Sequence, residues 1–418
     1  MTKKVFEGLK VVEFAWVAVG PQTSKYLADH GATVVRLESH THFDLFRGTS
    51  PFPQNIPGVN RSMFYGKYNS NKYHATCNLN LPQGRELAWK FIEWADVITE
   101  SFRPGTMKRW GLDYDSVIKV RPDIIYVSTS MQGQTGPFSQ YAGVGSMISA
   151  VAGFGEISGY PDQMPAPPYG AYSDYFCQRF LSTTLMAAMD HKQLTGKGQW
   201  IEQSQLETSV YFNAPLSIDY EVNGHIAGRD GNRLPYAAPH GIYPCEGSDC
   251  WIAIAVFNDD QWQAFCSVLG NPDWTRQEKF SSLLQRKNNE DELDSLIGQW
   301  TNTKRSKDIE VLLQDQGVPA SVVEKSSDLY QDPQLAHRKF YVKMNHAEMG
   351  TPNYPQQADF ILSKTPRETI MPSPCLGEHN EYVYKELLKL SDDEISDRMA
   401  DESITTELPA GFKLTTNM

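Results

Sequence analysis

"LKVVEFAWVAVGPQTSKYLADHGATVVRLE", residues 9–38, carries the clearest structural pattern in the chain. The segment LKVVEF is typical of a buried strand, and AWVAVGP is typical of a loop. QTSKYLADHGA predicts a short helix that ends at Gly31, and TVVRLE predicts a second strand. A strand, a helix and a strand in this order predict a βαβ unit whose two strands run parallel.

The alternation of strands and helices continues beyond this unit. Strands are predicted at 74–81, 96–102 and 123–130, and a helix at 82–95 begins with Pro82 in its first turn. Further on, QWIEQSQLETSVYF predicts a strand that runs into a helix. Because such alternation is typical of layered α/β proteins, we predict an α/β fold with a Rossmann-like large domain.

The composition of the rest of the chain predicts where its loops and domains lie. Residues 141–173 are rich in Gly, Ala, Ser and Pro, which predicts a loop region of the kind that often carries functional sites. A hairpin, three helices and a short strand predict a smaller α+β domain, and the Pro-rich tail has one predicted helix near 381–390. The predicted domains are a large α/β domain at 1–220, a linker at 221–239, a small α+β domain at 240–330 and a C-terminal segment at 331–418.

Composition and charge argue against several classes of protein. Of 418 residues, 40% are hydrophobic and 21% are charged, which is typical of a globular chain with a large core. The net charge of -12 argues against a nucleic-acid partner, which requires a basic surface. No stretch approaches the ~20 apolar residues of a membrane span, and no signal-peptide pattern is found. We therefore predict a cytoplasmic protein with no membrane partner.

The motifs of common cofactors and metal sites are missing. A dinucleotide-binding turn needs G-x-G-x-x-G, and the turn after the first strand has only Gly20. We therefore predict no nicotinamide and interpret Glu38 as the end of a strand. Walker A, G-x-S-x-G and H-E-x-x-H sequences do not occur. His40, His42 and Asp44 are candidate metal ligands, but such a short polar cluster is more typical of a solvated loop, and we predict no metal.

Two segments with basic residues lie next to predicted strands, the first just before a strand and the second just after a strand end. NSNKYH contains Lys72, and ESFRPGTMKRWG contains Arg103, Lys108 and Arg109 around a Pro-Gly turn. Basic residues at the carboxyl ends of parallel strands suit a ligand that carries phosphate. A solvated surface turn explains the same residues, and the local pattern leaves both interpretations open.

Asp174 stands at the start of a predicted helix in YGAYSDYFCQRFLSTTLMAAM, residues 169–189. Asp is a favoured helix cap, worth about 1 kcal/mol. The N–H groups of a helix start also hold a carboxylate ionised, so that it can act as a nucleophile. From spacing alone the cap interpretation is favoured over the nucleophile.

These segments, taken in order, resemble the family III CoA-transferases, the group of formyl-CoA transferase and carnitine CoA-transferase, whose relatives include the α-methylacyl-CoA racemases. The resemblance runs nearly end to end. Besides the opening stretch it includes NSNKYHATCNLNLPQGRELAWKFIEWADVITESFRPGTMKRWGLDYDSV, GQTGPFSQYAG, SDYFCQRFLSTTLMAAMDHKQLTGKGQWIEQSQLE and PCLGEHNEYVYKELLKLSDDEI. Five such segments in the same order make a chance likeness improbable.

The resemblance implies an enzyme that moves CoA from an acyl-CoA to a free carboxylic acid, with no metal and no nicotinamide. It places the catalytic aspartate on Asp174. The positions that contact CoA or acyl-CoA fall on Val17, Ala18, Ser39, Asn69, Asn71, Lys72, Ser101, Phe102, Arg103, Arg109, Ala142, Gly143 and Gly145. It also implies an interlocked, ring-like dimer in which the C-terminal segment returns to the large domain. A homodimer and a heteromer with a paralogous subunit both fit.

The expected reaction passes through an aspartyl anhydride and an aspartyl-CoA thioester. Each step has a tetrahedral oxyanion, which backbone N–H groups can stabilise. The turn at 143–145 and the PHG segment at 239–241 are alternative sources of these groups.

Departures from the family pattern bear on the activity. Formyl-CoA transferase has Gln at the position of Ala18, which argues against formyl or oxalate specificity, and Ser39 replaces a basic residue that holds the adenine end. The glycine-rich loop that covers the formyl-CoA transferase site has no match near 225–260. Racemases have a His at the position of Val144, and racemisation needs a proton donor on each face of the α-carbon, so transferase chemistry is favoured. A racemase or epimerase and a non-catalytic CoA-binding subunit of a heteromeric transferase remain as alternatives.

Aromatic residues cluster in sequence near the predicted site. They suit an aromatic or bulky acceptor such as an arylsuccinate, with succinyl-CoA as donor, and they equally suit a core. These residues are Trp16, Tyr160, Tyr169, Tyr172, Tyr175 and Phe176.

Overall fold

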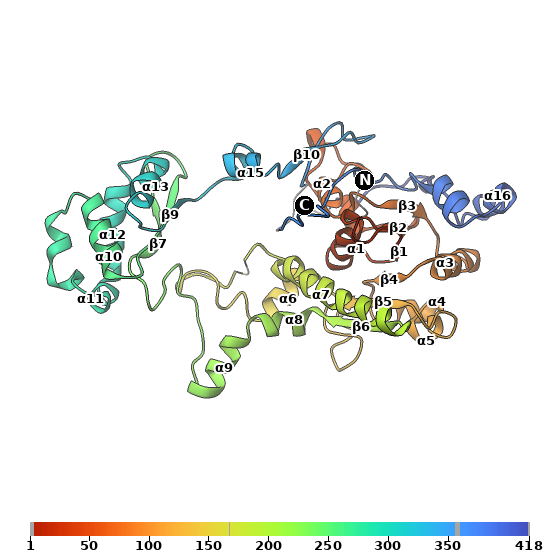
Figure 1. Ribbon diagram of the computed structural model, residues 1–418, viewed down its shortest axis with the longest axis horizontal. Coiled ribbons are helices and arrows are strands. Elements are labelled where there is room, and N and C mark those ends of the chain that lie inside the picture. Colours follow the sequence, from red (N-terminus) through yellow and green to blue (C-terminus); the bar gives the residue numbers. More distant parts are fainter. Residues whose placement is uncertain (1–3, 167, 356–359, 417–418) are drawn as a thin grey trace. The chain divides into compact units, whose positions relative to one another are not determined.

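The computed structural model describes residues 4–166, 168–355 and 360–416. Its centre is a six-stranded sheet in which every pair of neighbours runs parallel, in the order β3-β2-β1-β4-β5-β6 (Figure 1). The strands are β1 (Lys10–Glu13), β2 (Thr33–Glu38), β3 (Tyr73–Thr76), β4 (Val97–Glu100), β5 (Ile125–Ser130) and β6 (Gln199–Ser204). This is the doubly wound order, and the direction of winding reverses between β1 and β4. The predicted α/β fold with a Rossmann-like domain is confirmed.

Helices cover both faces of this sheet. Those before the hairpin described below are α1 (Val19–Asp29), α2 (Met63–Asn69), α3 (Pro82–Trp94), α4 (Thr106–Trp110), α5 (Tyr114–Val117), α6 (Gly145–Val151), α7 (Tyr172–Thr195), α8 (Gln205–Phe212) and α9 (Ala214–Asn223). Near the C-terminus are a π-helical turn at Tyr382–Leu387 and α16 (Asp392–Ala400).

Alternate residues of each strand point to opposite faces of the sheet, which gives two cores. One core packs against α3 and the C-terminal segment, and its strand residues include Val12, Val35, Ile98 and Tyr126. The other packs against α1 and α7, and its strand residues include Val11, Val34, Val97 and Ile125. Because both faces are buried, the strands read as near-continuous apolar runs.

The chain divides by its contacts into two compact units. Unit 1 consists of Met1–Gly153, Pro168–Ile218 and Pro333–Met418, and unit 2 consists of Phe154–Pro167 and Asp219–Asp332. Unit 2 contains an antiparallel hairpin of β7 (His240–Pro244) and β8 (Trp251–Ala255), which also pairs with β9 (Ala320–Val322). Around this sheet lie α10 (Asp259–Val268), α11 (Leu283–Asn288), α12 (Glu290–Thr301) and α13 (Ser306–Gln314).

The C-terminal segment is attached to the edge strand β3 of unit 1. The Asn380 side-chain oxygen accepts a hydrogen bond from the Thr76 N–H at 2.8 Å, and the Tyr384 hydroxyl donates to the Thr76 carbonyl at 2.6 Å. Before it come α14 (Ser326–Leu329), α15 (Pro333–His337), β10 (Tyr341–Lys343) and β11 (Asn353–Pro355). A segment more than 300 residues away in sequence therefore caps the edge of the sheet.

Three secondary-structure predictions are wrong in part. The strand predicted at 74–81 ends at Thr76, because residues 77–81 leave the sheet to lead into α3. The loop predicted at 141–173 contains α6, and the tail contains α16 as well as the predicted helix near 381–390.

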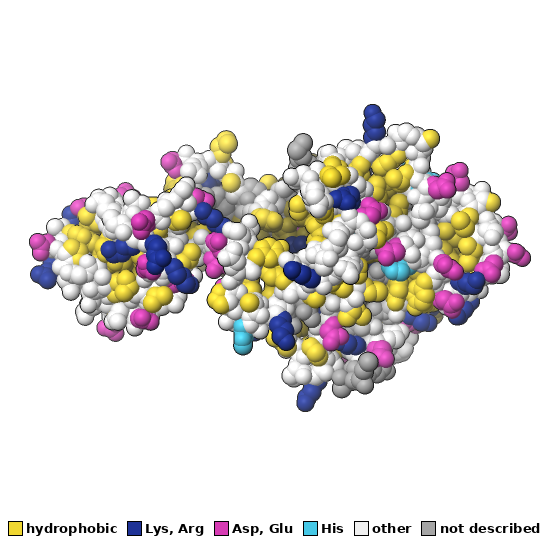
Figure 2. Space-filling model, turned by 90° about the horizontal axis from the view of Figure 1, so that it is seen from above, with side chains coloured by type: hydrophobic (Ala, Val, Ile, Leu, Met, Phe, Trp, Pro, Cys, Tyr) yellow, Lys and Arg dark blue, Asp and Glu magenta, His cyan; other side chains and the backbone are white. Residues whose placement is uncertain are grey.

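On the face shown in Figure 2, acidic and basic side chains are interspersed rather than gathered into one basic area. Among the described residues, no helix is both long and apolar enough to cross a membrane. In the same part of the chain, no three His, Cys, Asp or Glu side chains are grouped so as to hold a metal ion.

Candidate active site

Asp174 lies inside the first turn of α7, which begins two residues earlier than predicted. Ala171 is the N-cap residue, and no side chain caps the helix. The Asp174 N–H donates to the Ala171 carbonyl at 3.0 Å, as an interior residue does. The interpretation of Asp174 as a helix cap is therefore wrong, and its carboxylate is not engaged in holding the helix start.

The Asp174 carboxylate is buried without a compensating partner. The residue is 7% exposed, and within the described part of the chain no hydrogen bond to its carboxyl oxygens is present. Burial raises the pKa of Asp174 from its ordinary value of 3.8 to about 7. This direction is opposite to the expectation that the helix start would keep the carboxylate ionised. A poorly solvated carboxylate that ionises near neutral pH is suited to chemistry.

Gly145, the first residue of α6, faces this carboxyl group. A Cβ at this position would overlap the Asp174 carboxyl carbon and both of its oxygens. The hydroxyls of Ser149 and Ser173 both donate to the Gly145 carbonyl at 3.0 Å, and the Ser173 N–H donates to the Ser149 hydroxyl at 3.2 Å. These bonds fix the start of α6 against the start of α7, so the missing side chain of Gly145 is what makes room for the carboxyl group.

Two further elements reach the start of α7. The Gln22 side-chain amide, on α1, donates to the Asp174 carbonyl at 3.3 Å. Tyr68, on α2, is buried, and burial, Tyr175 and the Asp174 carboxylate raise the pKa of its hydroxyl. The Lys67 ammonium lies 4.9 Å from the centre of the Tyr175 ring. Neither Gln22 nor Tyr68 was predicted, because only the packing of α1 against α7, and of α2 against α1, brings them here.

A pocket of about 190 Å³ lies at the carboxyl ends of β1 to β4, where the winding of the sheet reverses. Its lining includes Phe14, Trp16, Leu37, Ser39, Phe102 and Trp110. The ring centres of Trp16 and Phe102 are 5.2 Å apart, and those of Phe102 and Trp110 are 5.4 Å apart. We call this the switch-point pocket. It contains the predicted residues Ser39 and Phe102, while Trp110 was missed, although it stands in a segment singled out for its basic residues.

The loops after β1 and β4 are joined across the switch point. The Trp16 N–H donates to the Ser101 hydroxyl, and this hydroxyl donates to the Trp16 carbonyl, both at 2.9 Å. The hydroxyl's one donor and one of its two acceptor sites are thus used, so Ser101, a predicted ligand-contacting residue, also positions Trp16.

Val17 has an unusual backbone conformation beside this pocket. Its φ of 69° lies in the left-handed region, where a β-branched residue is strained. The Asp44 carboxylate accepts a hydrogen bond from the Val17 N–H at 2.9 Å and so stabilises the turn. Ala18 follows as the N-cap residue of α1 and is 3% exposed. Strain of this kind is typical of functional sites.

The other predicted residue group, around Lys72, is buried in the protein. The Lys72 ammonium donates to Glu13 at 2.8 Å and to the Pro21 carbonyl and the Asn69 side-chain oxygen at 2.9 Å. All three donors are used, so the prediction that this ammonium faces an anionic ligand is not supported by its geometry.

Asn71, two residues after Asn69, holds the C-terminal segment in place. Its amide nitrogen donates to Asp29 at 2.7 Å, and its oxygen accepts from the N–H groups of Ile370 and Met371 at 2.8 and 3.0 Å.

The remaining predicted positions are exposed. Arg103 and Arg109 lie on the surface beside α4, and the Arg109 guanidinium donates to the Thr106 hydroxyl at 3.1 Å. Ala142 and Gly143 are exposed just before α6. These residues are open to a ligand, unlike Asn69, Asn71 and Lys72.

The acidic residues at the end of β2 belong to a buried ion network. Arg36 pairs with Glu13, with Asp44 and, at 2.8 Å, with Glu38. Arg47 pairs with Glu38 at 2.8 Å. The interpretation of HTHFD as a solvated loop is therefore wrong for Asp44. Its carboxylate neutralises Arg36 and caps the turn at Val17.

The six aromatic residues do not form one cavity. Trp16 lines the switch-point pocket, and Tyr160 lies in unit 2. The other four lie near the start of α7, in two contacts: Tyr169 with Tyr175, and Tyr172 with Phe176.

The sequence and the fold match known proteins over nearly the whole chain. A family model described as CoA-transferase family III matches residues 6–380. Succinate–glutarate CoA-transferase of Agrobacterium fabrum is 30% identical over 92% of this chain and 96% of its own. Succinyl-CoA–D-citramalate CoA-transferase of Chloroflexus aurantiacus is 28% identical over 93% and 96%. The crystal structure of a CaiB/BaiF family protein from Brucella suis is 28% identical, with a TM-score of 0.84 over 92% of this chain and 100% of that chain. The chain belongs to CoA-transferase family III and is a transferase that uses CoA thioesters as substrates.

Proposed function

We propose that Asp174 is the nucleophile of this transferase. A carboxylate oxygen attacks the thioester carbonyl of the donor, the C–S bond breaks, and CoA leaves as the thiolate while an anhydride joins the acyl group to Asp174. The thiolate then attacks the Asp174 carbonyl carbon. The donor acid leaves as a carboxylate, and CoA remains on Asp174 as a thioester.

The second half of the reaction reverses these steps with a new acid. The acceptor carboxylate attacks the carbonyl carbon of the aspartyl-CoA thioester. The C–S bond breaks, the thiolate leaves, and a second anhydride now joins the acceptor to Asp174. The thiolate attacks the acyl carbon of the acceptor, so that acceptor-CoA forms and the Asp174 carboxylate is restored. The observation that carries the proposal is that this carboxylate is buried without a hydrogen-bonding partner.

Gly145 supports the same assignment. Its backbone lies against the carboxyl group with no side chain between them. We propose that backbone N–H groups of the 143–145 turn approach the tetrahedral oxyanions at this point, an interaction worth a few kcal/mol, roughly, in other enzymes. Each anhydride must also be kept from water, and the low exposure of Asp174 is consistent with that requirement.

CoA is proposed to enter through the switch-point pocket. The rings of Trp16, Phe102 and Trp110 suit the adenine ring, and Ser39 lies in the same lining. The turn at Val17 and Ala18 leads from this pocket to α1, and the exposed Arg103 and Arg109 suit the phosphates. Asn69, Asn71, Lys72 and Ser101 are proposed to hold these elements in place rather than to touch CoA.

Succinyl-CoA is the proposed donor, in keeping with the named activity of the Chloroflexus relative. The acceptor is a free carboxylic acid. We do not extend the proposal to an aromatic acceptor, because the aromatic residues of unit 1 belong to separate contacts. Racemisation has no specific support, since Val144 carries no proton to exchange and stands 48% exposed at the N-cap of α6.

The proposed assembly is a dimer with a second copy or with a paralogous subunit. Helix α9 has no buried residue, although half of its side chains are apolar. Large apolar side chains of α8, α9 and the segment after them are exposed: Tyr211, Phe212, Ile218, Tyr220, Val222 and Ile226. Such a surface is larger than an isolated chain normally leaves to water.

Trapping of the intermediate tests the nucleophile. The protein is incubated with succinyl-CoA and treated with hydroxylamine, which converts an aspartyl thioester or anhydride to a hydroxamate. Mass spectrometry of the peptide that contains Asp174 is expected to show this modification, and Asp174→Ala protein is the control. Turnover without any modification at Asp174 would refute the proposal.

A further inference from the structure

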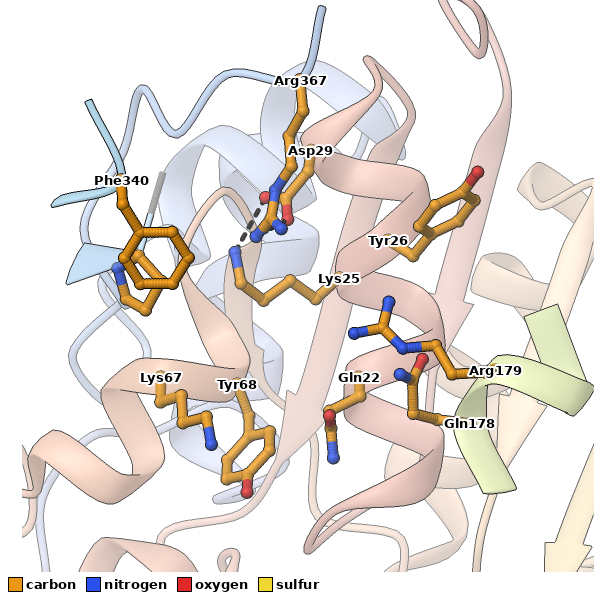
Figure 3. Close-up of a pocket in the computed structure, with 11 residues that line it drawn as sticks. Gln22, Lys25, Tyr26, Asp29, Lys67, Tyr68, Gln178, Arg179, Phe340 and Arg367 are labelled. Atoms are coloured by element: carbon orange, nitrogen blue, oxygen red, sulfur yellow. Dashed lines mark hydrogen bonds and ion pairs between the residues drawn. The ribbon is translucent and has the colours of Figure 1, made fainter. Parts of the chain in front are cut away.

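A second cavity, of about 450 Å³, lies in unit 1 between α1, α2, α7 and the C-terminal segment. We call it the α1–α7 cavity. Gln22 of α1 lines it, with Lys67 and Tyr68 of α2 on one side and Gln178 and Arg179 of α7 on the other (Figure 3). Lys25, Asp29 and Arg367 line the rest of the wall.

The described lining residues are rich in cations and include one acid, Asp29, which is already paired. Asp29 accepts from Lys25 at 2.8 Å, from Asn71 at 2.7 Å and from the Arg367 guanidinium at 2.5 Å. Lys67 has no ion pair within the described residues, and burial lowers the pKa of its ammonium. Lys67 therefore brings to the cavity a positive charge that no acid of the described residues neutralises, which favours an anionic occupant.

One lining residue of the cavity, Gln22, contacts the backbone of Asp174. Its side-chain amide donates to the Asp174 carbonyl. Gln178 lies four residues after Asp174 on α7, a separation of about 6 Å along the helix axis. Standard bond lengths place the two carboxyl carbons of a five-carbon dicarboxylic acid about 5 Å apart. One carboxyl group at Asp174 would thus leave the other at the level of Gln178, Arg179 and Lys67.

We propose that the α1–α7 cavity binds the distal carboxylate of a short dicarboxylic acid and that Lys67 sets this specificity. The inference rests on the proposed function, because it assumes that the acid reacts at Asp174. The reacting carboxylate is held at Asp174, and the distal carboxylate pairs with Lys67, across the cavity from Arg179. A monocarboxylic acid of equal length leaves this charge unpaired and is a poorer acceptor.

Acceptor kinetics with glutarate and valerate, five-carbon acids that differ in one carboxylate, test the proposal. Wild-type protein is expected to favour glutarate in kcat/KM, and Lys67→Met is expected to lower the glutarate-to-valerate ratio at least tenfold. Lys67→Arg keeps the charge and is expected to restore most of the ratio. Lys119→Met removes an exposed lysine outside both cavities and is expected to leave the ratio unchanged.

Labelling of Asp174 by butyryl-CoA, which has no second carboxylate, separates the two proposals. If hydroxylamine traps this adduct but Lys67→Met keeps the ratio within twofold of the wild-type value, the specificity inference is overturned and the nucleophile stands. If turnover proceeds and no thioester labels Asp174, both are overturned.

Discussion

Unit 1 contains two sets of buried carboxylates with opposite surroundings. Glu13, Glu38 and Asp44 lie in the network around Arg36, where each accepts at least one ion pair. Asp174 is about as well shielded from water, yet no cation or N–H group pairs with its carboxylate in the described residues. The first set holds the strands and the Val17 turn in place, and the second is an acid without a partner among the described residues, which lies against Gly145.

The pKa directions follow from this difference. Burial acts to raise the pKa of Glu13, but Lys72 and Arg36 lower it below its usual range, and Arg47 and Arg36 do the same for Glu38. Asp174 has only the effect of burial, and its pKa rises to about 7. Asp44 is an intermediate case, since burial and the Glu38 charge outweigh Arg36 and raise its pKa. Ion pairs therefore distinguish Glu13 and Glu38, whose pKa values are lowered, from Asp174, which we propose to be the reactive acid.

The largest effect is expected from removing the unpaired acid. Asp174→Asn keeps the shape of the side chain but cannot form the anhydride, so kcat for CoA transfer should fall by about 10³-fold or more. Circular dichroism should stay close to that of the wild type, and the urea midpoint should stay close to it near pH 4, where the folded Asp174 is uncharged. Activity above a tenth of the wild-type value would place the chemistry elsewhere.

Removing the centre of the paired set should act on stability instead. Arg36→Met leaves Asp44 buried without its cation and removes one of the two cations of Glu13, and breaking a buried ion pair costs about 3–5 kcal/mol in comparable cases. Urea unfolding monitored by tryptophan fluorescence measures the loss. Arg109→Met, at an exposed position, is the control and should change stability by less than about 0.5 kcal/mol. Equal stability of the two variants would mean that the network is not a structural element.

The substitution Gly145→Ala is expected to displace the Asp174 carboxyl group without changing its chemical nature. The new methyl group falls on the Asp174 carboxyl, and a shift of about 1 Å costs on the order of 10²-fold in rate. We expect the loss in kcat, with KM for succinyl-CoA nearly unchanged. Gly228→Ala, where an added Cβ meets nothing within 4 Å, is the matched control. A large rise in KM alone would indicate a binding role for Gly145.

Asp174 and the paired carboxylates Glu13 and Glu38 should change the free energy of unfolding with pH in opposite directions. Transfer requires ionised Asp174, so kcat/KM should rise about tenfold between pH 6 and 8, around the apparent pKa near 7. Because the folded pKa of Asp174 lies above its ordinary value of 3.8, its contribution favours folding at low pH and is lost as the pH rises through 7.

Glu13 and Glu38 have lowered folded pKa values, so their contribution is present above about pH 4.5 and is lost as the pH falls below that value. Urea midpoints of wild-type and Asp174→Asn protein, measured from pH 4 to 8, should diverge toward higher pH. Parallel curves would show that Asp174 is not perturbed.

The sequence predicts the positions of the strands well, but it predicts the ion pairs of their charged residues poorly. The strand TVVRLE matches β2 residue for residue, because a short apolar run bounded by a turn has few alternatives. Arg36 and Glu38 within that run read as polar strand positions, and their partners Glu13, Asp44 and Arg47 are found only in the folded chain. Local patterns contain no information on such pairing.

The candidate site shows the same limit. Asp174 was found through a family resemblance, since its position near a helix start favoured a cap. Its contact with Gly145, its burial and the raised pKa depend on α6 packing against α7, and α6 itself lies in a segment whose Gly and Ser content predicted a loop. The surroundings of Lys72 could not be predicted either, because the sequence does not show the three acceptors that its buried ammonium contacts.

Transfer of oxygen from the acceptor to Asp174 tests the central claim most directly. With an acceptor acid labelled with oxygen-18 in its carboxylate, one acceptor oxygen must remain on the regenerated Asp174 after a single turnover. We predict that mass spectrometry finds the heavy oxygen in the peptide that contains Asp174, and in the donor acid released by the next turnover. Formation of acceptor-CoA with no heavy oxygen at Asp174 would contradict the account, because the acids would then exchange CoA without passing through this carboxylate.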